Sequence, residues 1–170
     1  MLTEGPGSWA YGLADRLGLD GKLVALGDHL YRLGIGSSAQ PFQLVQGVGE
    51  MLATLYQHYP LSIISIRGRR TTERFLEQFN LRRFFIAIAN GQTCRHTKPY
   101  PDPILWVAAK MGVAPAACLM VGDTVPDIQS GKRAGAQTVG VLCGFGERHE
   151  LEKAGADLIL KSTADLVEIL

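Results

Sequence analysis

The sequence predicts an α/β fold in which helices cover both faces of a doubly wound parallel sheet. From about residue 48 onward, short apolar runs typical of buried strands alternate with amphipathic patterns typical of helices. Turn residues punctuate this alternation: Pro60 precedes one apolar run, and Gly112 and Gly135 each follow a helical pattern. We therefore expect strands linked by crossover helices.

The predicted elements follow one another in a regular order. Asp102 and Pro103 match the N-cap and first position of one helix, and Gly112 matches its stop. The full set comprises a helix at 48–56, a strand at 61–66, a helix at 72–79, a strand at 84–89, a helix at 103–111, a strand at 118–121, a helix at 124–134, strands at 137–142 and 158–160, and a last helix from 162.

The first forty residues follow a different pattern. Large apolar residues at helical spacing predict two helical segments with no clear strand between them: Trp9, Leu13, Leu17, Leu23, Leu26, Leu30 and Leu33. The Gly- and Ser-containing segment 34–40 is typical of a linker. We therefore expect a helical appendage at residues 1–40 and an α/β core at residues 41–170.

Composition excludes several classes of protein. Seventeen basic residues balance sixteen acidic ones, so the net charge of +1 gives no reason to expect binding to nucleic acid. No apolar stretch reaches the roughly 18 residues that span a membrane, and the N-terminus lacks a signal peptide. Three cysteines without metal-ligand spacing fit a reduced, cytoplasmic setting. The oligomeric state is left open.

Two carboxylates in the segment VGDTVPD at residues 121–127 are the strongest local signal. Asp123 lies at the tip of a predicted strand and Asp127 in the first turn of the next helix. Ligands of doubly wound sheets bind at such tips, and oxygen ligands suit Mg²⁺. Thr124 and Asp127 also match a capping box, in which Asp127 merely stabilises the helix start. Both interpretations stay open.

Two further residues could bind phosphate. Ser65 ends a predicted strand, where its hydroxyl and the neighbouring amides could reach a phosphate oxygen. Lys98 lies in the segment TKPYPDP at residues 97–103, whose prolines restrict the backbone and so preorganise the ammonium group. Taken singly, Ser65 is compatible with a turn residue and Lys98 with a solvated loop residue.

Along the chain, a strand followed by Ser65 comes first, then Lys98 with its proline, and then a strand followed by Asp123 and Asp127. This order resembles the second, third and fourth motifs of the haloacid dehalogenase superfamily, and of its phosphoglycolate-phosphatase-like members in particular. The resemblance implies a Mg²⁺-dependent phosphohydrolase that acts on a small phosphorylated metabolite. It implies that Ser65 and Lys98 bind the transferring phosphoryl group, with Lys98 as a catalytic residue. It also implies that Asp123 ligates Mg²⁺ and that Asp127 supports the metal site.

The family's first motif, an apolar strand ending in Asp-x-Asp-Gly-Thr, has no clear counterpart in the sequence. Asp20 and Asp28 are the nearest acids, and the leucine spacing around them favours helix. We therefore expect the central strand, between those of Ser65 and Asp123, to be missing, and residues 1–40 to be the remnant of a helical cap. A phosphatase truncated at its N-terminus fits this pattern.

Two other functions compete with this one. A catalytically inactive relative that binds phosphate or a protein partner would also lack the motif, so the sequence leaves open whether the chain is an enzyme. The receiver domain also combines Asp, Ser or Thr, and Lys with Mg²⁺. Its acidic cluster comes early and its lysine late, whereas here Ser65 and Lys98 precede Asp123. That order argues against a receiver domain.

Overall fold

The computed structural model describes residues 42–170 together with Leu26 and His29. Leu26 and His29 are helical, in agreement with the helical pattern predicted around them. The remainder of the predicted helical appendage, the linker at 34–40 and the two acids Asp20 and Asp28 lie outside the described residues. The division between appendage and core therefore stays a prediction.

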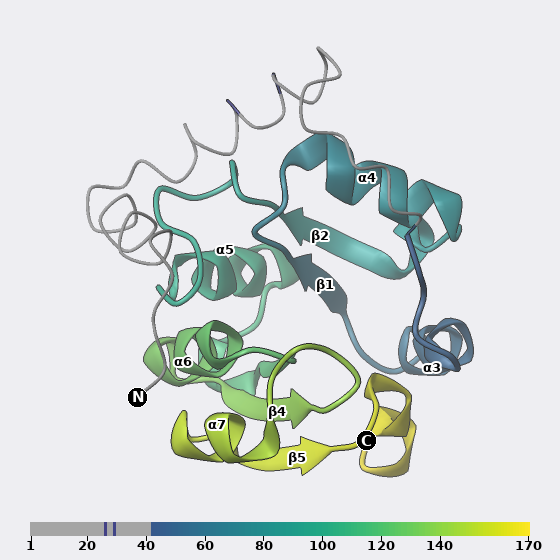
Figure 1. Ribbon diagram of the computed structural model, residues 1–170. Coiled ribbons are helices and arrows are strands. Elements are labelled where there is room, and N and C mark those ends of the chain that lie inside the picture. The colour runs from purple at the N-terminus through teal and green to yellow at the C-terminus, as the bar shows by residue number, and fades with distance from the viewer. Residues whose placement is uncertain (1–25, 27–28, 30–41) are drawn as a thin grey trace.

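The described chain alternates strands with helices (Figure 1). Its elements are α3 (Val48–Leu55), β1 (Leu61–Ile64), α4 (Arg69–Gln78), β2 (Phe85–Ala89), α5 (Asp102–Met111), β3 (Leu119–Gly122), α6 (Val125–Ala134), β4 (Gln137–Val141), α7 (Arg148–Lys153) and β5 (Leu158–Leu160), with 3₁₀ helices at Arg82–Phe84, Pro115–Ala117 and Thr163–Glu168. Each predicted strand of the core is present.

Three details differ from the prediction. The last helix is a 3₁₀ helix, and α7 is an additional short helix that begins at a capping box formed by Glu147 and Glu150. Helix α5 includes Asp102 as its first residue rather than as its cap, because the backbone is already helical at Pro101. An acid in the first turn still interacts favourably with the positive end of the helix.

The five strands form two parallel sheets. β1 pairs with β2, and β4 lies between β3 and β5. Figure 1 shows the first sheet in the upper half of the molecule and β4 and β5 in the lower half. Strands β1 and β3, which Ser65 and Asp123 follow directly, belong to different sheets. The described chain therefore divides at the position where we expected a central strand.

Helices cover both faces of the second sheet. Side chains alternate along β4, and those of Val139 and Val141 join a core cluster that also contains residues of α3 and the C-terminal 3₁₀ helix. Thr138 faces the other way, so close to α6 that a Cβ at Gly131 would lie 2.5 Å from its methyl group. The predicted α/β fold with a parallel arrangement is confirmed.

Burial differs between the middle of a sheet and the division between the sheets. Residues 138–141 of β4 are buried, whereas all four residues of β1 are only partly buried. In β3 only Met120 is buried. Helix α5 bridges the division, because its buried Ile104 shares a core cluster with Met120 of β3, and Ile64 of β1 packs against that cluster. The two sheets thus share a core although their facing strands are not paired.

Candidate active site

The four predicted site residues follow the carboxyl ends of the strands. Ser65 comes directly after β1, Asp123 directly after β3, and Asp127 in the first turn of α6. Lys98 lies in the long loop between β2 and α5. Because parallel strands end at the same edge of a sheet, this is where ligands of doubly wound folds bind.

Lys98 and Asp127 form a buried ion pair. The ammonium Nζ of Lys98 contacts Oδ1 of Asp127, and the two side chains are only 13% and 4% exposed. The other oxygen of Asp127, Oδ2, accepts hydrogen bonds from the Thr124 amide at 3.0 Å and the Thr124 hydroxyl at 2.6 Å. Asp127 therefore caps α6 and holds Lys98 at the same time.

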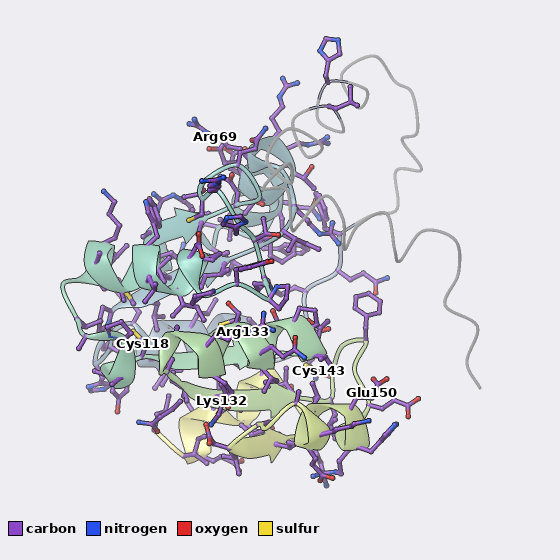
Figure 2. All side chains as sticks on the ribbon, turned by 90° about the vertical axis from the view of Figure 1, so that its left-hand side faces the viewer. Arg69, Cys118, Lys132, Arg133, Cys143 and Glu150 are labelled. Atoms are coloured by element: carbon purple, nitrogen blue, oxygen red, sulfur yellow. The ribbon has the colours of Figure 1, made fainter. Side chains whose placement is uncertain are left out.

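Helix α6 also fixes the loop that carries Lys98. The Ser130 hydroxyl donates to the Tyr100 carbonyl at 2.7 Å, and the Arg133 guanidinium donates to the Pro99 carbonyl at 2.8 Å. Figure 2 labels Arg133 on this helix, next to Lys132. Ser130 is fully buried, so its hydrogen bond is shielded from water. The loop is thus anchored at Pro99 and Tyr100, directly after Lys98.

Sequence reasoning missed Ser130 and Arg133. The available signal was weak: Ser130 is a polar residue on the buried face of a helix, where a hydroxyl needs a partner. Nothing in the spacing of α6 indicates which carbonyls it reaches. Arg133 carries no local signal at all.

Asp123 is held by a loop that comes later in the chain. Its Oδ2 accepts a hydrogen bond from the Phe145 amide at 2.9 Å, and its carbonyl accepts one from the Gly146 amide at 2.8 Å. Phe145 and Gly146 were not among the predicted site residues. Asp123 adjoins Thr124, so Asp123 lies in the same short segment as the capping pair of Thr124 and Asp127.

Ser65 occupies a turn at the tip of β1. Its amide donates to the Ala89 carbonyl at 2.9 Å, which extends the pairing of β1 with β2. Its hydroxyl oxygen accepts a hydrogen bond from the Arg67 amide at 3.1 Å, and its proton remains available for donation. Within residues 42–170, no hydrogen bond or ion pair joins Ser65 to Lys98, Asp123 or Asp127.

The described side chains at the strand tips would supply only some of the ligands of a metal site. Both oxygens of Asp127 are engaged, whereas Oδ1 of Asp123 accepts no hydrogen bond from the residues that the structure describes. Across the same residues, no three His, Cys, Asp or Glu side chains are grouped closely enough to hold a metal ion. Mg²⁺ usually keeps several waters, so one protein carboxylate fits a site completed by water, substrate and another acid.

A hollow on the described surface lies away from the strand tips. It has a volume of about 480 Å³ and surrounds the start of β1, at the opposite end of the strand from Ser65; it is lined by Tyr56, Gln57, His58, Tyr59, Pro60, Leu61 and Ile86. No acid or lysine lines it.

No helix in the described ranges combines the length and apolar character needed to cross a membrane.

Known proteins match this chain in sequence and in fold. It is 33% identical to the phosphoglycolate phosphatase of Escherichia coli (strain K12) over 111 residues, which are 65% of this chain and 44% of that relative. It is 34% identical to the pyrophosphatase PpaX of Oceanobacillus iheyensis over 110 residues, 65% of this chain and 51% of the relative. The chain therefore spans about half the length of these curated relatives.

Solved structures give the same result. The crystal structure of a predicted phosphoglycolate phosphatase from Haemophilus somnus 129PT superposes with a TM-score of 0.70 at 28% identity, covering 75% of this chain and 57% of that one. A hydrolase from Pseudomonas syringae superposes with a TM-score of 0.68 at 31% identity, covering 74% and 59%. The family model for haloacid dehalogenase-like hydrolases matches residues 26–141. The chain belongs to the haloacid dehalogenase-like hydrolase family.

Proposed function

We propose that this chain is the phosphate-handling part of a Mg²⁺-dependent phosphomonoesterase that acts on a small phosphorylated metabolite. The observation that carries the proposal is the buried Lys98–Asp127 pair, which lies at the strand tips beside Asp123. The matched relatives support it, since one is a phosphoglycolate phosphatase and another a pyrophosphatase.

Lys98 would bind the phosphoryl oxygens and balance their charge. Asp127 orients the ammonium group, and Thr124 in turn orients Asp127. A cation held in place before the substrate arrives needs little reorganisation during the reaction, which is the condition for strong electrostatic stabilisation. The hydroxyl of Ser65 would donate a further hydrogen bond to the phosphoryl group.

Asp123 would hold Mg²⁺ through Oδ1, and Asp127 would support the metal site indirectly, through Lys98 and Thr124. When bound, Mg²⁺ would supply neutralisation of charge on the phosphoryl group as the nucleophile approaches. Asp127 has both oxygens engaged. Its contribution therefore comes from positioning rather than from direct ligation.

The nucleophile would come from a strand between β1 and β3. In this family a carboxylate forms a covalent phospho-enzyme that water then hydrolyses. The partial burial of β1 and β3 supports a further strand at the division between the sheets. Such a strand would place an acid beside Lys98. It would come from outside residues 42–170, and a chain truncated at its N-terminus fits this requirement.

Hydrolysis of p-nitrophenyl phosphate, with and without Mg²⁺, tests the proposal. The comparison includes this chain, a form extended upstream in the reading frame of its gene, and the Asp123→Ala variant of each. We expect Mg²⁺-dependent turnover in the extended form and its loss in the Asp123→Ala variant. Turnover by the unextended chain would instead assign the nucleophile to Asp20 or Asp28.

An inactive relative that binds phosphate is the second candidate function. It is favoured by the engagement of both oxygens of Asp127, which leaves Asp123 as the one acid at the described tips with an oxygen that accepts no hydrogen bond. This candidate predicts that phosphate and Mg²⁺ bind to both forms of the chain while neither form turns over. The hydrolysis assay therefore separates the two functions.

A further inference from the structure

Large apolar side chains gather around the hollow at the start of β1, away from the strand tips. Tyr56, Tyr59 and Ile86 line the hollow. Leu170 adjoins it, because the Tyr59 hydroxyl donates to the Leu170 carbonyl at 2.9 Å. In Figure 1 the C-terminal 3₁₀ helix accordingly lies beside α3. The four side chains are between 41% and 54% exposed. We call them the Tyr56 patch.

The composition of the Tyr56 patch fits a surface that binds protein. Apolar surface in contact with water is unfavourable, and a cluster of exposed large apolar side chains marks a site of interaction. Tyrosine is enriched at the centre of protein–protein interfaces, where lysine and acids are depleted. No acid or lysine lines the hollow, so its interior has this character.

A basic side chain flanks the patch at its Tyr56 end. The guanidinium of Arg83 lies over the ring of Phe84, 4.7 Å from the ring centre, and that ring packs edge-on against Tyr56 at 5.8 Å. The neighbouring Arg82 already donates to the Phe85 carbonyl at 2.7 Å. Arg83 forms no ion pair within residues 42–170, so its charge is available to a partner.

An acidic side chain flanks the patch at its Leu170 end. Glu168 is the last residue of the 3₁₀ helix Thr163–Glu168, which leads directly to Leu170, and its side chain is exposed. In the part of the chain that the structure describes, Glu168 has no ion-pair partner. The Tyr56 patch is therefore bordered by an available cation at one end and an available anion at the other.

We propose that the Tyr56 patch is the interface of a homodimer, in which Arg83 of each copy pairs with Glu168 of the other. A two-fold axis brings the same surface of both copies together, so the interface must be complementary to itself. A surface with opposite charges at its two ends meets this condition, because rotation about the axis sets each cation against an anion. The same association covers both sets of apolar side chains.

The homodimer is independent of the proposed function. The patch lies at the opposite end of β1 from Ser65, so the strand tips of both copies stay open to ligands. Complementary charges at the rim would fix how the two copies are oriented, and the tyrosines would supply most of the affinity.

Reversal of single charges tests the pairing by sedimentation equilibrium. Arg83→Glu alone, or Glu168→Arg alone, sets like charges against each other in the dimer. In an equimolar mixture of the two variants, every such pair of the mixed dimer again has opposite charges. Lys110→Glu is the matched control, because Lys110 in α5 is also an exposed cation over an aromatic ring, 5.4 Å from the centre of Trp106. Circular dichroism reports folding.

We expect a monomer–dimer equilibrium in the unaltered chain and the same dissociation constant in Lys110→Glu. Each reversal alone should raise that constant by roughly 100-fold, because facing like charges are strongly unfavourable at an interface, and the mixture should restore dimers. A monomeric unaltered chain would overturn the proposal. Dimers that persist in both reversals, or that stay absent from the mixture, would overturn it too.

Tyr56→Ala tests the apolar part of the interface. We expect its dimer dissociation constant to rise by roughly 10-fold or more, since tyrosines often dominate the binding energy of an interface. Phe145→Ala is the matched control, because it removes a ring that is 92% exposed and lies after β4, away from the patch. An equal rise in both variants would overturn the assignment. Protection of residues 56–61 from hydrogen exchange in a monomeric chain would instead assign the patch to another segment of the same chain.

Discussion

Helix α6 takes part in two Lys–Asp pairs that are built alike but differ in burial. In each pair one aspartate oxygen contacts the lysine, and the other accepts hydrogen bonds from the amide and hydroxyl of a threonine. Asp127 is bound in this way by Lys98 and Thr124. Asp157 is bound by Lys132 and Thr138. The side chains of the first pair are 13% and 4% exposed, and those of the second 42% and 48%.

The comparison teaches that hydrogen-bond pattern alone does not identify a functional pair. The exposed Lys132 pair ties α6 to the segment before β5, and water screens its charges. The buried Lys98 pair lies where parallel strands end, and each charge depends on the other for compensation. Because of its burial and its position at the strand tips, we propose the Lys98 pair, and not the Lys132 pair, as the phosphate site.

The largest effect should come from breaking the buried pair. Lys98→Ala leaves the Asp127 carboxylate buried without its cation, which typically costs about 3 kcal/mol or more. Urea unfolding of the variant measures this loss. The double variant Lys98→Ala/Asp127→Asn should recover part of it, since the uncompensated charge is gone. Unchanged stability in Lys98→Ala would contradict the pairing.

A smaller loss should follow Gly122→Ala, which reaches the same pair from another side. The added Cβ would lie 2.3 Å from Cβ of Asp127 and 2.6 Å from its Oδ2. Overpacking of this kind costs about 2 kcal/mol, and displacement of Asp127 would loosen Lys98 as well. Urea unfolding measures the change, with Gly49→Ala as the control. Because an added Cβ at position 49 meets open space within a helix, the control should gain up to about 1 kcal/mol.

Asp127 and Lys98 illustrate what sequence reasoning reaches in this chain. The spacing of Thr124 and Asp127 predicted a capping box, and that local contact is confirmed. The same spacing could not indicate that Asp127 also contacts Lys98, because that contact joins positions 29 residues apart. The order of the motifs predicted both as site residues. Their contact with each other depends on how α6 packs against the loop between β2 and α5.

The fold was largely predictable because strands and helices alternate with clear turn residues. Helix α7 was missed because it has six residues and one buried side chain, Leu151, so no periodic pattern develops. The contacts that the Phe145 and Gly146 amides make with Asp123 were missed for a different reason. Neither Gly144 nor Gly146 has a positive φ, so no local turn pattern points to them. They matter because they lie directly against Asp123, which is more than twenty residues earlier in the chain.

The exposed pair should show its own pH dependence. Hydrogen bonds from Lys132, and then from the side chain and backbone of Thr138, lower the pKa of Asp157 from 3.8 to about 2. Because the Asp157 carboxylate binds a proton less readily in the folded state, its ionised form stabilises the fold. This contribution is fully present above about pH 4 and is lost as pH falls from about 4 towards 2. As the pH is lowered, the urea midpoint of unfolding should fall less steeply in Asp157→Asn than in the unaltered chain. An equal slope in both proteins would contradict the assignment.

Lys132→Ala should have the smallest effect. The Lys132 side chain is half-exposed, so loss of its contact with Asp157 should change the melting temperature by no more than about 2 °C. Thermal unfolding checks this directly. A loss as large as that in Lys98→Ala would remove the distinction between the two pairs.

Binding of inorganic phosphate, measured from the ³¹P line width, tests most directly whether the buried pair is the phosphate site. The measurement compares the unaltered chain with Lys98→Ala and Lys132→Ala at equal concentration and under conditions in which all three are folded. We predict broadening in the unaltered chain and in Lys132→Ala, and its loss in Lys98→Ala. Equal broadening in all three proteins, or loss in Lys132→Ala alone, would contradict the assignment of phosphate to Lys98.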